Sequence, residues 1–506
     1  MTAVIDAPAS ADARPREAAG AERVSGRNLW TLLVVMAGTF VAIMDSFIVN
    51  VAVPSIRADL NASLAQVELA VGGYVLVYGL LLVTGGRLGD LFGTRRLLLA
   101  GIAVFTLASL AAGLAPDPVT LVVCRVVQAA GAALFYPQVL AVLQTAFTGR
   151  ARARAFAVFG ATIGLASIAG QVLGGLLVHL DLFGLGWRNV FLVNVPFGVL
   201  TLAGVLGLLP AGRPAAGRTT GRRLDPAGVG LLGGALLLLS VPLVEGPHLG
   251  WPAWTLVSMA ASLPALAAFV VWERRVAARG GSPLVDPALF RRRAFSAGNA
   301  VALAFFAGNA GLFFVLTLQL QNGMGYSPLA AGAAFVPLAV AFSAASLLGP
   351  RLTDRLGHHV LTLGYAANAA GTLALLGTVR AAGTELTGWA LLPALAVIGF
   401  GQGLGVSPLI GTALAGVPAE DAGSAGGVLE TAGQIGMSLG VSALGMVFST
   451  ALGPATSPAA YSHAFALTLL GNLALALAAL ALLPPLLRRN RPADTPHSAD
   501  GAQGER

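Results

Sequence analysis

The sequence has little charge, no lysine and a single cysteine. Of its 506 residues only 10% are charged, and all the Lys and Arg positions are arginine. Soluble proteins carry about 25% charged residues because their surfaces face water. A chain this poor in charge cannot cover a water-exposed surface, so most of its outer surface must face lipid. The lone Cys124 excludes an intrachain disulfide.

The sequence contains long runs of apolar residues. Hydrophobic residues make up 56% of the chain, and the mean hydropathy is +0.80. A bilayer span needs about 20 apolar residues, and about fourteen runs of that length follow one another along the chain. The 65 glycines suit helices packed closely in lipid. We therefore predict an all-α integral membrane protein with 14 spans.

The arginines predict the orientation. They cluster in alternate loops, for example at Arg95–Arg96, Arg150–Arg154 and Arg291–Arg293. Basic loops stay on the cytoplasmic side. Both termini fall on that side, which requires an even number of spans and agrees with fourteen. The net charge of +8 is thus a topology signal and not a sign of nucleic-acid binding. We expect a bacterial inner (plasma) membrane protein with both termini in the cytoplasm.

An internal repeat predicts the domain organisation. The segments Gly85–Gly93 and Gly349–Gly357 share Gly, Arg, Leu, Asp and Gly at matching offsets, 264 residues apart (354 minus 90). That shift corresponds to about eight spans and predicts six helices, two inserted helices and six more. Repeated halves are how many transporters build two bundles around a central site. The predicted parts are a disordered tail 1–28, a bundle 29–209, inserted helices with their loops 210–294, a bundle 295–487 and a disordered tail 488–506.

Four motifs resemble those of a known family. Gly86–Arg96, GRLGDLFGTRR, resembles the loop signature of the major facilitator superfamily. Met44–Pro54 resembles the first-helix signature of its 14-span drug:proton antiporters, the EmrB/QacA type. Trp187–Gly198 and Pro287–Phe295 resemble that subfamily's entries to helices six and nine. The resemblance covers residues 29–487 and implies the major facilitator fold and proton-coupled drug efflux, without indicating the substrate.

The loop motif also predicts a conformational latch. Gly93 permits a tight reversal between two helices. Asp90 can cap the next helix and pair with Arg87, Arg95 or Arg96. Such a cluster would hold two helix ends in one state. We assign the latch to Gly86, Arg87, Asp90, Gly93, Arg95 and, in the second copy, Asp354. The alternative is ordinary cytoplasmic loop charge with no switching role.

Three ionisable residues stand out within the predicted spans. A charge at the bilayer centre costs at least about 2.5–3.5 kcal/mol, so it needs a partner or a watery cavity. Asp45 and Arg125 lie about 12 and 10 Å from the same membrane face, so they could pair. Glu430 lies about 10 Å from the cytoplasmic face. Two carboxylates against one arginine leave one acid that could take up a proton or attract a cationic substrate.

The resemblance implicates a first-helix acid and a fourth-helix arginine in proton handling. We carry that role to Asp45 and Arg125 and add Glu430 as a possible second acid. The alternatives are a static ion pair that holds helices together and, for Glu430, a solvated acid near the interface.

Other polar and small residues extend the predicted site. Six amide side chains are candidates for lining a substrate cavity: Asn50, Gln128, Asn309, Gln319, Gln402 and Gln434. Ordinary hydrogen bonds between helices are the alternative for each. Small residues spaced along the fifth span let helices approach closely, and they are Gly164, Gly170, Gly174 and Gly175.

These features favour a transporter over an enzyme. The sequence has no phosphate-binding Gly-Lys-Ser/Thr motif, no metal-ligand spacing among its six histidines and no loop long enough for a catalytic domain. We expect no cofactor and no metal. The favoured function is proton-coupled export of small amphipathic substrates, cationic ones among them, by a monomer that alternates between two shapes in the lipid bilayer. The alternatives are a facilitator-type metabolite exporter or uniporter without proton coupling, and a non-transporting membrane sensor or membrane-embedded enzyme.

Overall fold

The computed structural model describes residues 26–62, 64–209, 224–357, 359–455 and 457–487. Within them, 14 helices are long and apolar enough to cross a membrane, which confirms the predicted number. The two predicted disordered tails lie outside this range except for residues 26–28. Those three residues form the first turn of a helix and not part of a tail, because a helix can continue past the apolar run that marks its span.

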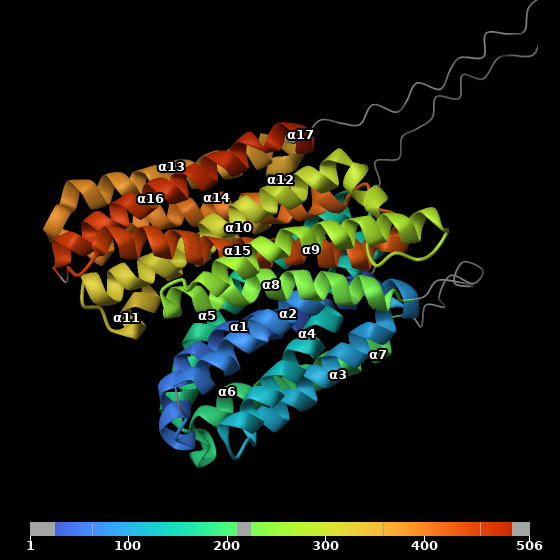
Figure 1. Cartoon of the computed structure of the whole chain (residues 1–506), viewed down its shortest axis with the longest axis horizontal. Helices are drawn as coiled ribbons and strands as arrows, with labels where there is room; N and C mark the ends of the chain where they lie inside the picture. Colours follow the sequence, from blue (N-terminus) through green and yellow to red (C-terminus); the bar gives the residue numbers. More distant parts are fainter. Residues whose placement is uncertain (1–25, 63, 210–223, 358, 456, 488–506) are drawn as a thin grey trace, which may run out of the picture.

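The first half of the chain forms one bundle (Figure 1). Its six spans are α1 (Gly26–Leu60), α2 (Leu64–Phe92), α3 (Thr94–Gly113), α4 (Pro118–Ala146), α5 (Gly149–Leu180) and α6 with α7 (Asn189–Leu192 and Asn194–Leu208). The sixth span is split because Pro196 has no N–H to donate to the preceding turn. Within the bundle α3 packs on α4 and α7, α2 packs on α4, and α1 packs on α5 and α7.

The second half forms a matching bundle (Figure 1). Its spans are α10 (Arg293–Leu318), α11 with α12 (Pro328–Ala333 and Val336–Leu356), α13 (His359–Ala382), α14 (Gly388–Leu414), α15 (Ala422–Leu452) and α16 with α17 (Pro458–Ala481 and Leu483–Leu487). Here α10 packs on α15 and α16, and α14 packs on α12 and α13.

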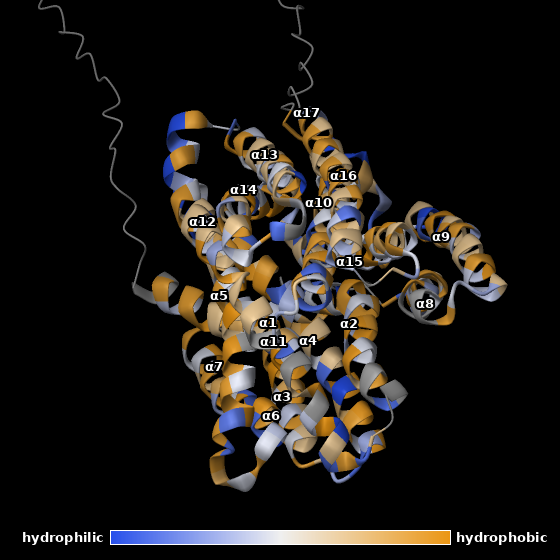
Figure 2. Cartoon of the chain, turned by 90° about the vertical axis from the view of Figure 1, so that its left-hand side faces the viewer, coloured by the Kyte–Doolittle hydropathy of each residue, from blue (hydrophilic) through white to orange (hydrophobic). Residues whose placement is uncertain are grey.

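The two remaining spans, α8 (Pro226–Leu249) and α9 (Ala253–Ala278), pair with each other. Figure 2 shows them to one side of the two bundles, next to α2 and α15. Only α8 of this pair packs substantially on both α2 and α15. The inserted pair therefore covers one seam between the two halves.

Several helices begin at residues that satisfy free backbone N–H groups. Asp117 accepts a hydrogen bond from the Thr120 N–H at the start of α4, and Asp225 accepts from Ala227 and Gly228 at the start of α8. A proline in the first turn of each helix has no N–H that would need a partner. These starts fix where each apolar segment enters the membrane.

The two halves meet mainly through α2 with α15 and α5 with α12. These pairs are the second span of one half and the fifth span of the other, as expected for repeated halves. The contacts concentrate toward one end. There Gln144 of α4 donates to the Leu414 carbonyl, and a Cβ atom at Gly427 would lie 2.5 Å from the Leu82 carbonyl oxygen.

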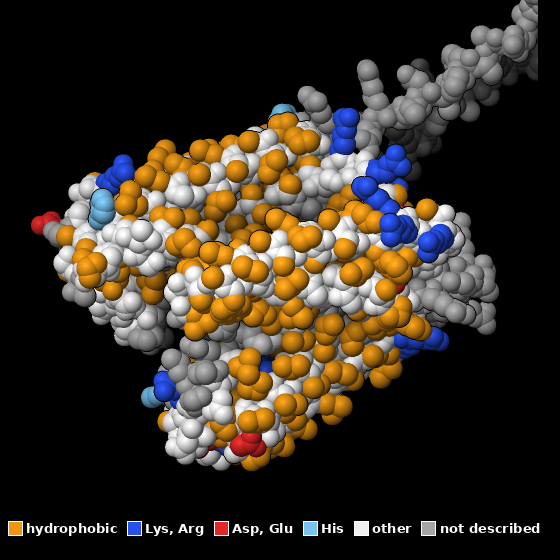
Figure 3. Space-filling view, in the orientation of Figure 1, with side chains coloured by type: hydrophobic (Ala, Val, Ile, Leu, Met, Phe, Trp, Pro, Cys, Tyr) orange, Lys and Arg blue, Asp and Glu red, His pale blue; other side chains and the backbone are white. Residues whose placement is uncertain are grey.

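That end carries exposed arginines, which include Arg150, Arg274, Arg291, Arg351 and Arg355, and we call it the arginine-rich end. Between the two ends, Figure 3 shows a surface covered by hydrophobic side chains. At the opposite end the two bundles diverge, with α6 and α11 lying apart (Figure 1). The two halves therefore contact each other at the arginine-rich end and diverge at the opposite end.

Close helix contacts depend on glycine. A Cβ atom at Gly164 would lie 2.6 Å from the Ser343 hydroxyl, and Cβ atoms at Gly170 and Gly174 would meet the carbonyl oxygens of Met44 and Ile48. Gly164 thus faces the other half, whereas Gly170 and Gly174 face α1 within their own half. Gly175 is half-buried on α5.

Gly440 gives a direct test of this packing. A Cβ atom there would lie 1.9 Å from the Ala307 carbonyl oxygen. We expect G440A to lower the thermal denaturation midpoint in detergent by several degrees, because α15 must move away from α10. The matched control is G233A on α8, where a Cβ atom meets nothing within 4 Å. Equal midpoints for the two variants would contradict this account.

Candidate functional site

Asp45 of α1 and Arg125 of α4 form an ion pair inside the first bundle. The Arg125 Nη1 lies 2.6 Å from the Asp45 Oδ2. Asp45 is fully buried and Arg125 is 1% exposed. Both charges are therefore removed from water, and the short charge-assisted hydrogen bond compensates for part of that cost.

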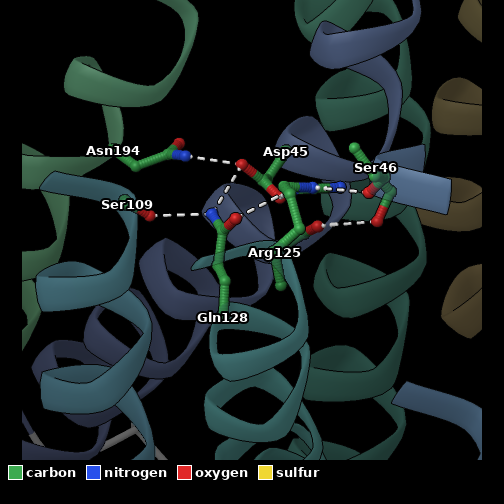
Figure 4. A network of polar contacts seen from close by, with 8 residues as sticks. Asp45, Ser46, Ser109, Arg125, Gln128 and Asn194 are labelled. Atoms are coloured by element: carbon green, nitrogen blue, oxygen red, sulfur yellow. Dashed lines mark hydrogen bonds and ion pairs between the residues drawn. The ribbon is translucent and has the colours of Figure 1, made fainter. Parts of the chain in front are cut away.

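The second carboxylate oxygen of Asp45 is also satisfied (Figure 4). Its Oδ1 accepts from the Gln128 amide at 2.9 Å and from the Asn194 amide at 2.6 Å. Gln128 also donates to Ser109 of α3 and accepts from Arg125. The Asp45 carboxylate thus receives donors from α4 and α7, and the network extends to α3.

Arg125 has further contacts on α2. Its Nε donates to the Ala70 carbonyl, and its guanidinium lies 4.1 Å from the centre of the Tyr74 ring. An arginine over an aromatic face is attracted by the ring quadrupole. The network therefore joins five spans of one half, and within the described residues none of these contacts reaches the second half.

Ser109, Asn194 and Tyr74 were not among the predicted site residues. Asn194 could have been found, because it is a polar residue within the apolar Trp187–Gly198 motif. Ser109 and Tyr74 carry no such signal. Serine is common in membrane helices, and an aromatic contact with a cation depends on helix rotation.

Glu430 lies apart from this network. It is half-buried on α15, within electrostatic range of Tyr78 of α2 and Tyr136 of α4. Glu430 therefore faces the first half across the interface between the bundles. In the part of the chain that the structure describes, no hydrogen bond or ion pair joins it to Asp45 or Arg125.

The amide candidates separate into different environments. Gln128 belongs to the Asp45 network. Gln402 donates to Asn309 at 2.9 Å, and Gln319 donates to Ser462 at 3.3 Å, both within the second half. Gln434 lines a pocket between α2, α8 and α15. The side chain of Asn50 lies outside the described residues.

Asp90 links the two halves at the arginine-rich end. It lies in the last turn of α2 and accepts from the backbone N–H groups of Gly423 and Ser424, at 2.9 and 2.8 Å, at the start of α15. A Cβ atom at Gly86 would meet the Gly423 carbonyl oxygen at 2.1 Å. Asp90 therefore caps a helix of the other half, and Gly86 allows the close approach.

The predicted capping of the following helix by Asp90 is wrong. The residue before α3 is Gly93, with φ +96, and no side chain caps that helix. The one-residue turn leaves Asp90 on the helical surface of α2, where it faces α15. The Arg87 Nη1 lies 3.7 Å from the Oδ1 of Asp421, just before α15. Arg95 donates to the Leu206 carbonyl of α7.

The second copy of the loop motif is different. Asp354 lies 3.5 Å from Arg150 of the first half, but their side chains are 51% and 81% exposed. Exposed ion pairs contribute about 0–1 kcal/mol. The two copies of the loop motif therefore share a sequence pattern, but their acidic residues differ in how deeply they are buried.

An acidic residue near the C-terminal end of α1 serves as a comparison for Asp45. Asp59 accepts from Arg188 at 2.5 Å and from the Trp187 indole at 2.9 Å. The hydrogen bond from Arg188, aided by that from Trp187, lowers the pKa of Asp59. This pair lies outside the span of α1, whereas Asp45 lies within it.

The described residues contain no group of three or more His, Cys, Asp or Glu side chains arranged to hold a metal ion.

Removal of Arg125 tests the ion pair. We expect R125M to lower the free energy of unfolding by about 3–5 kcal/mol, because it leaves the buried Asp45 charge uncompensated. The double variant D45N/R125M removes both charges and should recover most of that loss. Thermal denaturation of the purified proteins measures both effects. A double variant as unstable as R125M would show that the charge balance is not what matters.

Comparisons with known proteins agree with this architecture. The family model described as Major Facilitator Superfamily matches residues 35–441. A probable actinorhodin transporter of Streptomyces coelicolor is 39% identical over 84% of this chain and 73% of its own length. The puromycin resistance protein pur8 of Streptomyces alboniger is 36% identical over 88% of both chains. The tetracenomycin C resistance and export protein of Streptomyces glaucescens is 34% identical over 86% of this chain and 78% of its own.

Solved structures share the fold. The human organic anion transporter MFSD10 aligns with a TM-score of 0.63 at 14% identity and covers 90% of this chain and 99% of its own. The proton:xylose symporter XylE aligns with a TM-score of 0.57 at 16% identity, over 90% and 95% of the two chains. The matched family model, the relatives above 30% identity and the 14 spans together show that the chain belongs to the major facilitator superfamily, in its drug-efflux type.

Proposed function

We propose that this transporter exports amphipathic antibiotics or related drugs in exchange for protons. The observation that carries the proposal is the buried Asp45–Arg125 pair, an ionisable contact within a membrane-embedded bundle. Relatives of this chain are named as transporters, exporters or resistance proteins for actinorhodin, puromycin and tetracenomycin C. Their names support a similar class of cargo.

Protonation of Asp45 would change several contacts at once. A proton on its carboxylate removes the negative charge that holds the Arg125 guanidinium, and it leaves Arg125 as a buried cation with weaker compensation. The same carboxylate accepts from Gln128 and Asn194, so the attachment of α1 to α4 and α7 changes as well. A proton that stabilises one arrangement of these helices shifts the population between two shapes of the transporter.

The arginine-rich end is proposed to face the cytoplasm. Basic loops remain on the cytoplasmic side of a membrane, and both the first described helix and the last one, α1 and α17, have their outer ends there (Figure 1). In a bacterial inner membrane the divergent end then faces outward. With this orientation, we assign the described shape to the outward-facing state of the proposed alternating-access cycle.

Asp90 and Arg87 are proposed to hold that state. Asp90 places a carboxylate at the N-terminus of α15, where the helix dipole favours negative charge, and Arg87 lies beside Asp421. Opening the cytoplasmic side requires α2 and α15 to separate at this point. Both contacts then break, so together they favour closure.

Glu430 supports a preference for cations. It faces Tyr78 and Tyr136 across the interface between the halves. A carboxylate within electrostatic range of aromatic side chains suits an organic cation, because the acid supplies charge and the ring faces supply cation–π attraction. We propose that cationic amphipathic molecules are among the substrates.

The competing function is facilitated export without proton coupling, in which the Asp45–Arg125 pair is purely structural. Proteoliposomes with an imposed proton gradient separate the two. A proton-coupled exporter concentrates a drug and stops when a protonophore collapses the gradient, whereas a uniporter only equilibrates the drug.

Substitution of Asp45 tests the proposed proton coupling. We expect D45N to lower gradient-driven drug uptake into inverted vesicles at least tenfold, because Asn cannot take up and release a proton. Drug–drug exchange, which needs no net proton movement, should persist and will show that the variant is folded. The control D59N removes an acid on the same helix outside the span and should transport normally. Full gradient-driven transport by D45N would overturn the proposed role.

The latch has its own test. We expect D90N to shift the population toward opening of the arginine-rich end, because the neutral amide loses the charged contact with the start of α15. Spin labels at R96C and R351C, on a C124S background, should then move apart. Labels at D181C and E385C at the other end should approach each other. D354N should have a smaller effect, since its ion pair is exposed, and unchanged distances in D90N would refute the latch.

A further inference from the structure

A small pocket lies in the seam between the two halves, beside the inserted helix α8. Its walls come from α2, α8 and α15, and its volume is about 30 Å³. Apolar residues such as Leu76 and Leu236 form part of the wall. A space of this size takes about one water molecule or one small polar substituent.

Polar side chains without partners face this pocket. Ser240 of α8 and Gln434 and Ser438 of α15 line it, and the described residues make no hydrogen bond with any of the three. Thr431, also in the wall, donates to the Gly79 carbonyl at 3.4 Å. Three of the four polar groups therefore remain available to a ligand.

The depth of these groups restricts the ligand. Gln434 is 12 residues from the start of α15, and Ser240 is 14 residues from the start of α8. At 1.5 Å per residue they lie roughly 18 and 21 Å from the arginine-rich end. The hydrocarbon core is about 30 Å thick, so both groups lie within it, roughly two thirds of the way from the arginine-rich end to the other end. Lipid headgroups do not reach this depth, and acyl chains offer no hydrogen bonds.

Unpartnered polar groups at this depth are costly. A hydroxyl or amide without a hydrogen bond in an apolar medium is destabilising, and polar residues inside membranes are mostly associated with function. The partner that fits is a polar group attached to an apolar molecule. The transported drug is a molecule of this kind.

We propose that the pocket is a subsite for a neutral hydrogen-bonding substituent of the transported molecule, such as a hydroxyl, carbonyl or amide group. This inference rests on the proposed drug-export function. It makes Ser240 a determinant of substrate preference and gives the inserted helix α8 a part in recognition. Because α2 and α15 belong to opposite halves, their separation alters the pocket, and its occupancy depends on the state of the transporter.

Two probes separate this subsite from general drug binding. Puromycin carries hydroxyl and amide groups, whereas tetraphenylphosphonium is a bulky cation with no hydrogen-bonding group. The dissociation constant of each is measured on the purified full chain in lipid nanodiscs. The variants are S240L, which fills the pocket, and S240A, which removes only the hydroxyl. The control is G233L, which adds bulk to α8 where a Cβ meets nothing within 4 Å.

We expect S240L to raise the dissociation constant for puromycin at least fivefold and S240A to raise it about twofold to threefold. The value for tetraphenylphosphonium should stay within twofold of wild type, and G233L should change neither value. If the wild-type chain binds puromycin and both Ser240 variants bind it equally well, the pocket holds water only and the subsite is refuted. Equal losses for both probes would also refute it. A wild-type chain that binds neither probe would instead refute the drug-export function itself.

Discussion

The removal of the Asp45 and Arg125 charges from water is the constraint on which the rest of the site depends. In hydrocarbon neither charge is tolerated without a partner, so the helices that carry them must meet at this depth. Gln128 and Asn194 then satisfy the second carboxylate oxygen. The result is a bundle whose helix contacts include a buried ion pair, so under the proposed proton coupling a change in protonation would also change the packing.

The interface between the halves is built differently from the Asp45–Arg125 site. It depends on small residues and backbone contacts, with Gly427 against Leu82 and Gly160 against the Ser407 hydroxyl. Surfaces of this kind can separate without leaving a buried charge behind. The strongly polar contact of Asp90 with the start of α15 lies at the end of the seam, near the membrane surface. Water can reach those groups when the seam opens, which lowers the cost of breaking the contact.

The fold could be predicted largely from the sequence, because span length and the Gly85–Gly93 repeat are local signals. Asp45 and Arg125 could be placed at a common depth by counting residues along their helices. The rotation of each helix could not be counted in this way. Asp90 was expected to cap its own following helix and instead caps α15. Tyr74 was missed, since the rotation of α2 decides whether its ring faces Arg125. Asn194, which contacts Asp45, stood out only as a polar residue within an apolar motif.

The same limit explains why the inserted helices carried no predicted site residue. Ser240 is an ordinary serine in an apolar run, and Gln434 is one amide among several. Their relation appears only when α8 packs against both α2 and α15. A helix that touches both halves cannot keep all its contacts when the halves rock. Either α8 moves with one half, or its contacts are weak enough to exchange, as expected where unpartnered hydroxyl and amide groups line a space of about 30 Å³. On this argument the proposed transport cycle involves α8 together with the two bundles.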